Sequence, residues 1–263
     1  MITVLGIYFS GSGNTRFCVE SFCSHFEGCE TLSIEDARVT SALNKAEEIV
    51  LGYPIQFSSV PKIVRDFLSR NQVHFAGKRV YIIATMGLFS GDGAGCGARQ
   101  LKRYGTKIVG GLHVKMPDCI GDVSALKKPL EENQQLIRAA EVKLAQAADS
   151  YQQGKPTREG LGFFYHLAGL FGQRLWFYTK TRQYTDKLRI DPERCIGCGL
   201  CADLCPMDNL RLVNKKASAG PRCTMCYRCI NNCPKQAITL LGKTVVEQCR
   251  VEKYLPEPVP IPG

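Results

Sequence analysis

The residues with the clearest chemistry are eight cysteines in two repeats near the C-terminal end of the chain. Each repeat reads Cys-x2-Cys-x2-Cys-x3-Cys-Pro, as CIGCGLCADLCP and CTMCYRCINNCP. Thiolates are soft ligands that favour iron–sulfur clusters and zinc. Zinc sites typically use paired Cys-x2-Cys units with a longer gap, so two full copies with both prolines favour clusters over two structural zinc ions. The candidate ligands are Cys195, Cys198, Cys201, Cys205, Cys223, Cys226, Cys229 and Cys233.

Residues 188–242 resemble the bacterial-type two-cluster ferredoxins, and no ligand of that motif is missing. The resemblance implies two 4Fe–4S clusters, close enough for electrons to pass between them. In such proteins the fourth cysteine of each run ligates the other cluster. On that rule the first cluster is held by Cys195, Cys198, Cys201 and Cys233, and the second by Cys223, Cys226, Cys229 and Cys205.

A glycine-containing loop, YFSGSGNTR, lies between an expected strand and an expected helix. That position suits phosphate binding, because a helix N-terminus offers free N–H groups and a favourable dipole. A Walker A loop needs a lysine that is missing here, and a dinucleotide fingerprint would need glycine where Arg16 stands. The loop resembles the flavodoxin phosphate loop, T/S-x-T/S-G-x-T, although Val19 stands where the longer family signature tends to have alanine. The candidate binding residues are Ser10, Gly11, Ser12, Gly13, Asn14 and Thr15.

Two further loops follow expected strands at the carboxyl edge of the sheet, where doubly wound sheets bind ligands. In flavodoxin-like proteins these positions flank the isoalloxazine ring, so the resemblance implies FMN as the cofactor. One side would be formed by Pro54, Ile55, Gln56 and Phe57, and the other by Thr85, Met86, Gly87, Phe89, Ser90 and Gly91. The alternative interpretation of Phe57 and Phe89 is that they belong to the hydrophobic core.

The elements that must position these loops alternate between strand and helix in the first half of the chain. Apolar runs with β-branched residues predict buried parallel strands at 2–9, 31–34, 48–53, 78–87 and 107–114. Helices are expected from Thr15, from Pro61, near 99–104 and over 131–154. The predicted fold class is therefore α/β, a flavodoxin-like doubly wound five-stranded parallel sheet, followed by a small α+β two-cluster ferredoxin domain.

Composition divides the 263 residues into three parts. We predict a flavodoxin-like domain over 1–154, a basic and aromatic linker over 155–187, and a ferredoxin domain with a proline-rich tail over 188–263. Residues 151–190 carry 7 basic and 2 acidic side chains, half of the net charge of +10. This excess is typical of a solvated linker or of a surface for an acidic partner, a membrane or nucleic acid. We expect the aromatic residues of this part to cover a domain junction, namely Phe163, Phe164, Tyr165, Trp176, Phe177 and Tyr178.

Taken together, the chain resembles a flavodoxin–ferredoxin fusion protein, a family found mostly in anaerobic bacteria and archaea. The resemblance implies low-potential electron transfer through FMN and two clusters, between redox partner proteins with acidic docking surfaces. The alternative is an FMN-dependent oxidoreductase that acts on a small molecule. We expect no catalytic residue, because Asp92 is the only carboxylate in the three loops and its SGDG context is typical of a turn.

Other features of the sequence suggest no additional site. The remaining cysteines, Cys18, Cys23, Cys29, Cys96, Cys119 and Cys249, show no ligand spacing and are interpreted as reduced thiols. His113 lies in a strand pattern and is expected in the core. No signal peptide or membrane span is visible, so we expect a cytoplasmic protein that does not bind nucleic acid. The oligomeric state does not follow from the sequence.

Overall fold

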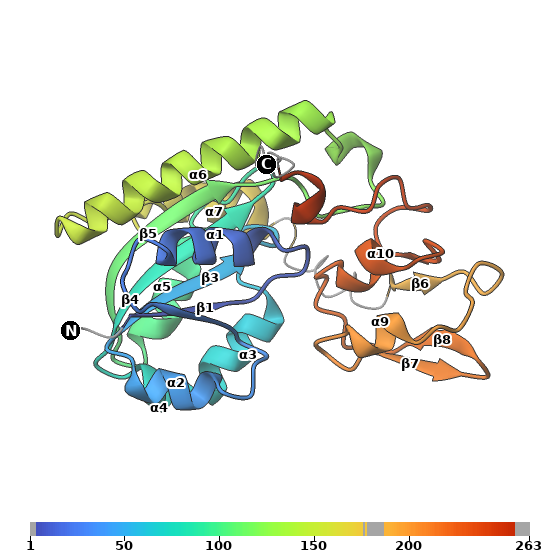
Figure 1. Ribbon diagram of the computed structural model, residues 1–263, viewed down its shortest axis with the longest axis horizontal. Coiled ribbons are helices and arrows are strands. Elements are labelled where there is room, and N and C mark those ends of the chain that lie inside the picture. Colours follow the sequence, from blue (N-terminus) through green and yellow to red (C-terminus); the bar gives the residue numbers. More distant parts are fainter. Residues whose placement is uncertain (1–3, 176, 178–186, 256–263) are drawn as a thin grey trace, which may run out of the picture.

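A central parallel sheet forms from the apolar runs of the first half of the chain. The computed structural model describes residues 4–175, 177 and 187–255. Its main sheet has the order β2-β1-β3-β4-β5, and every neighbouring pair is parallel (Figure 1). The strands are β1 (Val4–Tyr8), β2 (Glu30–Ser33), β3 (Glu48–Pro54), β4 (Arg79–Met86) and β5 (Lys107–Lys115). The five-stranded parallel sheet predicted from the sequence is confirmed.

Helices cover both faces of this sheet. Successive strand residues point to opposite faces, so Ile49 and Leu51 of β3 join one buried cluster while Val50 joins the other. One face packs against α1 (Asn14–Cys23) and α6 (Leu130–Gln152). The other is covered by α2 (Val39–Lys45), α3 (Lys62–Arg70), α4 (Gln72–Phe75) and α5 (Gly93–Lys102). Helix α5 begins earlier than the expected start near residue 99, directly after the third glycine-rich loop.

The cysteine repeats lie in a smaller domain beside the carboxyl end of the sheet (Figure 1). Two short antiparallel pairs frame it, β6 (Arg189–Ile190) with β9 (Ile238–Thr239) and β7 (Leu210–Val213) with β8 (Lys216–Ala219). Asn214 and Lys215 both have positive φ, of 50° and 61°, as a tight turn between β7 and β8 requires. The helices α9 (Leu200–Asp203) and α10 (Arg228–Asn232) each begin within one cysteine repeat.

The segment between the domains contributes α7 (Phe163–Gly169) and the π-helical turn η2 (Leu170–Arg174). The expectation that its aromatic residues cover a domain junction is wrong for Phe163 and Phe164, which are 68% and 84% exposed. Phe177 does approach the junction, because its ring stacks on Phe57 with centroids 4.7 Å apart. Trp176 and Tyr178 lie outside the described residues.

The two domains are joined by hydrogen bonds from several elements. The loop after β5 carries the short helical turn η1 (Ser124–Leu126) and, before it, Asp122. The Asp122 carboxylate is buried and accepts hydrogen bonds from Tyr227 Oη at 2.9 Å, from Leu240 N at 2.6 Å and from Leu241 N at 2.9 Å. A second contact joins the domains through Arg228, which donates to both carboxylate oxygens of Glu35, at 2.7 and 2.8 Å.

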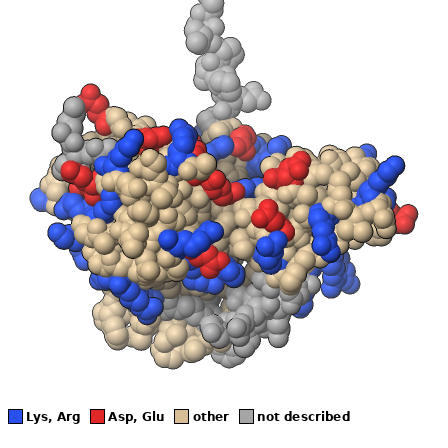
Figure 2. Space-filling view, turned by 90° about the horizontal axis from the view of Figure 1, so that it is seen from below, with Lys and Arg blue, Asp and Glu red and all other residues tan. Residues whose placement is uncertain are grey.

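The chain finally returns to the first domain through the turn η4 (Val251–Lys253). Val251 N donates to Ser12 O at 2.8 Å, and Val251 and Tyr254 are buried against α1 and α6. Figure 2 shows lysine and arginine side chains over both domains on one face, rather than in a single stripe. Within the described part of the chain, no helix is long and apolar enough to cross a membrane.

Candidate functional site

A cavity of about 360 Å³ opens at the carboxyl edge of the sheet. Its volume lies within the range usual for small-molecule sites. All three sequence-predicted loops reach it, which is what the parallel arrangement of β1, β3 and β4 requires, since their carboxyl ends meet at one edge. The predicted residues that line it are Ser10, Gly11, Ser12, Asn14, Thr15, Pro54, Ile55, Gln56, Phe57, Thr85, Met86, Gly87 and Phe89.

Side-chain hydrogen bonds hold the first loop against its neighbours. Asn14 Nδ2 donates to Pro117 O at 2.7 Å, and the Thr15 and Thr85 hydroxyls lie 2.7 Å apart. Ser10 Oγ and Asn14 Oδ1 are buried and have no hydrogen-bond partner among the described residues. Buried polar atoms are normally satisfied. A hydroxyl donor and an amide acceptor left open at a helix N-terminus fit the phosphate and hydroxyl groups of FMN.

Three of the predicted residues lie away from the cavity. Gly13 is on the outer side of its loop, where an added Cβ would lie 2.4 Å from Val251 Cγ1. Ser90 Oγ lies 3.3 Å from His113 Nε2, behind the cavity wall, and both side chains are buried. Gly91 packs against Gly169 of α7 with a φ of 55°, which glycine adopts without strain. A direct contact between these three residues and the cofactor remains a prediction.

A fourth loop, which sequence reasoning missed, also lines the cavity. It follows β5 and contributes Met116, Pro117, Asp118, Cys119 and Ile120. Its signal was available, because β5 ends at the same edge as the other strands. Burial raises the pKa of the Asp118 carboxyl, although a hydrogen bond from Ile120 N and the charge of Lys127 oppose the shift. Because it belongs to this loop, Cys119 lines the cavity and is not a thiol unrelated to the site.

The last wall of the cavity comes from the second cysteine repeat. Met225, Cys226 and Tyr227 line it, and Gln56 Nε2 donates to Thr224 O at 2.8 Å and Met225 O at 3.1 Å. Gly11 makes this close approach possible, since an added Cβ would lie 2.0 Å from Cys226 O. No sequence pattern predicted this contact, because it joins residues of two domains far apart in the chain.

The cysteines gather in two separate sets of four. One small cavity is lined by Cys195, Cys198, Cys201 and Cys233, and another by Cys205, Cys223, Cys226 and Cys229. In both cavities three cysteines come from one repeat and the fourth from the other. These are the two ligand sets expected from the crossed ferredoxin rule.

Backbone N–H groups point at sulfurs in both sets. Ala217 N and Ala237 N donate to Cys195 and Cys233, at 3.5 and 3.3 Å. In the second set, Met225 N donates to Cys223 Sγ at 3.4 Å, and Asn209 N donates to Cys205 Sγ at 3.3 Å. Such bonds stabilise electron-rich sulfur and tune cluster potentials.

Two further features of the second set fit a cluster. Asn209 Nδ2 is buried beside this cavity without a hydrogen-bond partner among the described residues, and an amide donor suits a sulfide acceptor. Burial raises the pKa of the Cys226 thiol to about 12. A bound metal would offset the cost of the buried thiolate.

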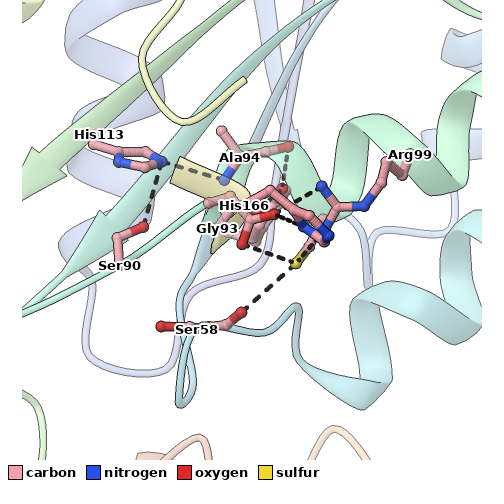
Figure 3. A network of polar contacts seen from close by, with 10 residues as sticks. Ser58, Ser90, Gly93, Ala94, Arg99, His113 and His166 are labelled. Atoms are coloured by element: carbon pink, nitrogen blue, oxygen red, sulfur yellow. Dashed lines mark hydrogen bonds and ion pairs between the residues drawn. The ribbon is translucent and has the colours of Figure 1, made fainter. Parts of the chain in front are cut away.

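Asp92 lies away from the cavity, directly before α5. Figure 3 shows Arg99 and His166 within the polar network at this place. The Asp92 side chain is fully buried, and Oδ2 lies 2.7 Å from Arg99 Nη1 and 3.0 Å from His166 Nδ1. Arg99 Nη2 also donates to Cys96 Sγ at 3.2 Å. The carboxylate thus links α5 to α7. His113, expected in the core, is buried as predicted, and burial lowers its pKa.

Comparison with known proteins agrees with both halves of the site. A family model described as a flavodoxin domain matches residues 5–110. Two models described as 4Fe–4S binding domains match residues 188–211 and 221–236. The chain is therefore a fusion of a flavodoxin domain and a ferredoxin-type domain, with FMN and two 4Fe–4S clusters as its cofactors. Electron transfer is the chemistry of such domains.

Solved structures include proteins with similar folds over the first half of the chain. A flavodoxin from the domain Archaea is 16% identical, with a TM-score of 0.42, over 57% of this chain and 99% of its own. The two-electron reduced flavodoxin of Megasphaera elsdenii is 21% identical, with a TM-score of 0.40, over 54% of this chain and 99% of its own. No curated protein matches the chain.

Proposed function

We propose that the protein carries low-potential electrons between redox partner proteins, with FMN and two clusters forming one continuous path. A single observation carries the proposal: Met225, Cys226 and Tyr227 line both the flavin cavity and the cavity of the second cysteine set. A shared wall of this kind would place FMN and one cluster on opposite sides of these three residues. When bound, FMN exchanges one or two electrons and each cluster exchanges one.

The positions of the flavin cavity and the two cysteine sets support a path in which each site neighbours the next. The second cysteine set lies against the flavin cavity, and both sets pack on one apolar cluster that includes Cys201, Met225 and Ile230. Burial raises the pKa of the Cys229 thiol, and the nearby Cys201 sulfur of the other set adds to that shift. In the first set, Cys198 is exposed. We infer the order flavin, second set, first set, solvent.

The finer assignments are part of the same proposal. The first cluster would be held by Cys195, Cys198, Cys201 and Cys233, and the second by Cys205, Cys223, Cys226 and Cys229. The boundaries near residues 154 and 188 remain predictions. A cytoplasmic location is proposed because eight metal-binding thiols need a reducing compartment.

The test is anaerobic reconstitution, full reduction and titration with ferricyanide, a small one-electron acceptor. We expect about four electrons per chain, two from FMN and one from each cluster. We also expect that no low-molecular-weight substrate saturates the oxidation rate. Zinc in place of iron, or a preparation without flavin, would contradict the carrier function.

An oxidoreductase acting on a small molecule is the second candidate, and Asp118 is the observation that favours it. This carboxyl lines the flavin cavity, and its raised pKa would help it hold a proton there. If the protein is such an enzyme, Asp118→Asn lowers turnover by about 100-fold, as removal of a general acid does. If it is a carrier, the same variant still delivers electrons to ferricyanide at the wild-type rate.

A further inference from the structure

The surface over the first cysteine set differs from the rest of the ferredoxin-type domain. Cys198 is exposed there, and three large apolar side chains beside it also face solvent. Ile196 is 58% exposed, Leu200 38% and Leu212 45%, and all three line the cavity of the first set. We call these four residues the exit patch. Apolar side chains gathered in this way on a surface mark an interaction site.

Basic side chains surround the exit patch. Lys235 lines the same cavity and is exposed. Arg194 and Lys215 are exposed too, and they lie in the chain close to Ile196 and Leu212 respectively. Lys216 is held in place, because its Nζ donates to Pro192 O at 2.8 Å and to Cys195 O at 2.6 Å. The exposed acidic side chains nearby are Asp191, Glu193 and Asp203, and the Asp191 carboxylate accepts from Glu193 N and Arg194 N. These four basic groups outnumber the three acidic ones around the patch.

The second cysteine set offers no comparable exit. Its cavity shares a wall with the flavin cavity, and Gln56 and Arg228 tie this part of the domain to the first domain. Cys205, Cys223, Cys226 and Cys229 are all partly buried, whereas Cys198 is the exposed member of the eight. A partner that exchanges electrons rapidly must approach a cofactor closely, so the first set is the accessible end of the path.

We propose that the exit patch docks a redox protein whose own docking face has an apolar centre ringed by aspartate and glutamate side chains. This proposal rests on the electron-carrier function and identifies where that function meets its partner. The charge around the patch selects an acidic partner and speeds its approach, while Ile196, Leu200 and Leu212 exclude water at the centre. In each encounter the protein loses one electron and the partner gains one, with no bond made or broken.

The experiment mixes the fully reduced protein with two probe proteins in a stopped-flow instrument under anaerobic conditions. The probes are an oxidised acidic 2Fe–2S ferredoxin and an oxidised basic c-type cytochrome, and ferricyanide serves as the small acceptor. The variant is Lys215→Glu/Lys235→Glu. Its matched control is Lys45→Glu/Lys102→Glu, which makes the same charge change at exposed positions on α2 and α5.

We expect the acidic probe to be reduced quickly at low salt and more slowly as salt rises. The exit-patch variant should lower that rate at least about tenfold, and the control should change it by less than about twofold. Ile196→Ser should lower the rate at high salt as well, because the apolar centre is not screened. If Lys215→Glu/Lys235→Glu loses iron, Lys215→Gln/Lys235→Gln replaces it with half the charge change.

The outcomes separate the two proposals. Equal rates for the exit-patch variant and its control would overturn the docking site while leaving the carrier function in place. Faster reduction of the basic probe than of the acidic one would also overturn it. A wild-type protein that reduces neither probe protein nor ferricyanide would overturn the carrier function, and the docking proposal with it.

Discussion

The two domains reach stability in different ways. The first has two large buried clusters, one on each face of a five-stranded sheet. The second has a single small cluster around Leu210, Ile230 and Ile238, and its strands pair only two by two. An apolar core of that size rarely supports a fold alone, and metal ligation commonly supplies the remainder. The comparison indicates that the first domain positions its cofactor on a stable sheet, whereas the second domain depends on its cofactors for stability.

The largest expected effect comes from removing iron. Chelation under anaerobic conditions should abolish hydrogen-exchange protection over residues 188–242, because the eight ligands replace most of a core there. Protection over β1, β3 and β4 should remain. Cys195→Ser should reproduce part of the loss and Cys29→Ser none of it. Retained protection in the iron-free second domain would break the comparison between the domains.

The next effect tests the contact that joins the domains. Asp122→Ala removes the carboxylate that accepts from Tyr227, Leu240 and Leu241, leaving two buried donors and one partly buried donor unpaired. We expect a loss of about 3 kcal/mol in the free energy of opening at Leu240 and Leu241, measured by native-state hydrogen exchange. Asp66→Ala, which removes only an exposed pair with Lys62, should cost less than about 0.5 kcal/mol. Equal costs would show that Asp122 does not couple the domains.

A smaller effect is expected where the second domain closes the flavin cavity. Gln56→Ala removes the two hydrogen bonds to Thr224 O and Met225 O. The FMN dissociation constant, measured by fluorescence quenching, should rise about tenfold, which corresponds to about 1.4 kcal/mol. Gln152→Ala removes one exposed hydrogen bond to His25 O and serves as the control. An unchanged FMN affinity in Gln56→Ala would mean that the first domain binds FMN without help.

The smallest effect concerns a single amide near the second cysteine set. Asn209→Asp keeps the oxygen that accepts from Arg222 N and replaces the Nδ2 donor, which has no partner in the described part of the chain. One cluster potential should fall by about 40 mV, the equivalent of one hydrogen bond of about 1 kcal/mol for one electron. Redox titration followed by EPR measures it. Asn214→Asp, in the exposed turn between β7 and β8, should leave both potentials nearly unchanged.

The sequence predicted much of this structure because its signals are local. Alternating apolar runs indicated β1 to β5, and the repeated cysteine spacing indicated two sets of four. The phosphate loop was visible because Ser10 to Thr15 lie together in the chain. Side chains brought in from a distance had no such signal: Gln56 reaches Thr224 across 168 positions, and Tyr227 reaches Asp122 across 105. Phe163 and Phe164 were misassigned because an apolar pair does not reveal whether anything covers it.

The most direct test of the account is a flash experiment on the protein with all its cofactors bound. A light pulse reduces FMN in the presence of a sacrificial donor, and the bleaching of the clusters is followed at several protein concentrations. Because the flavin cavity and the second cysteine set share a wall, we predict that the rate of cluster bleaching does not depend on protein concentration. A rate that rises in proportion to concentration would mean that electrons pass between molecules, and would contradict one continuous path within the chain.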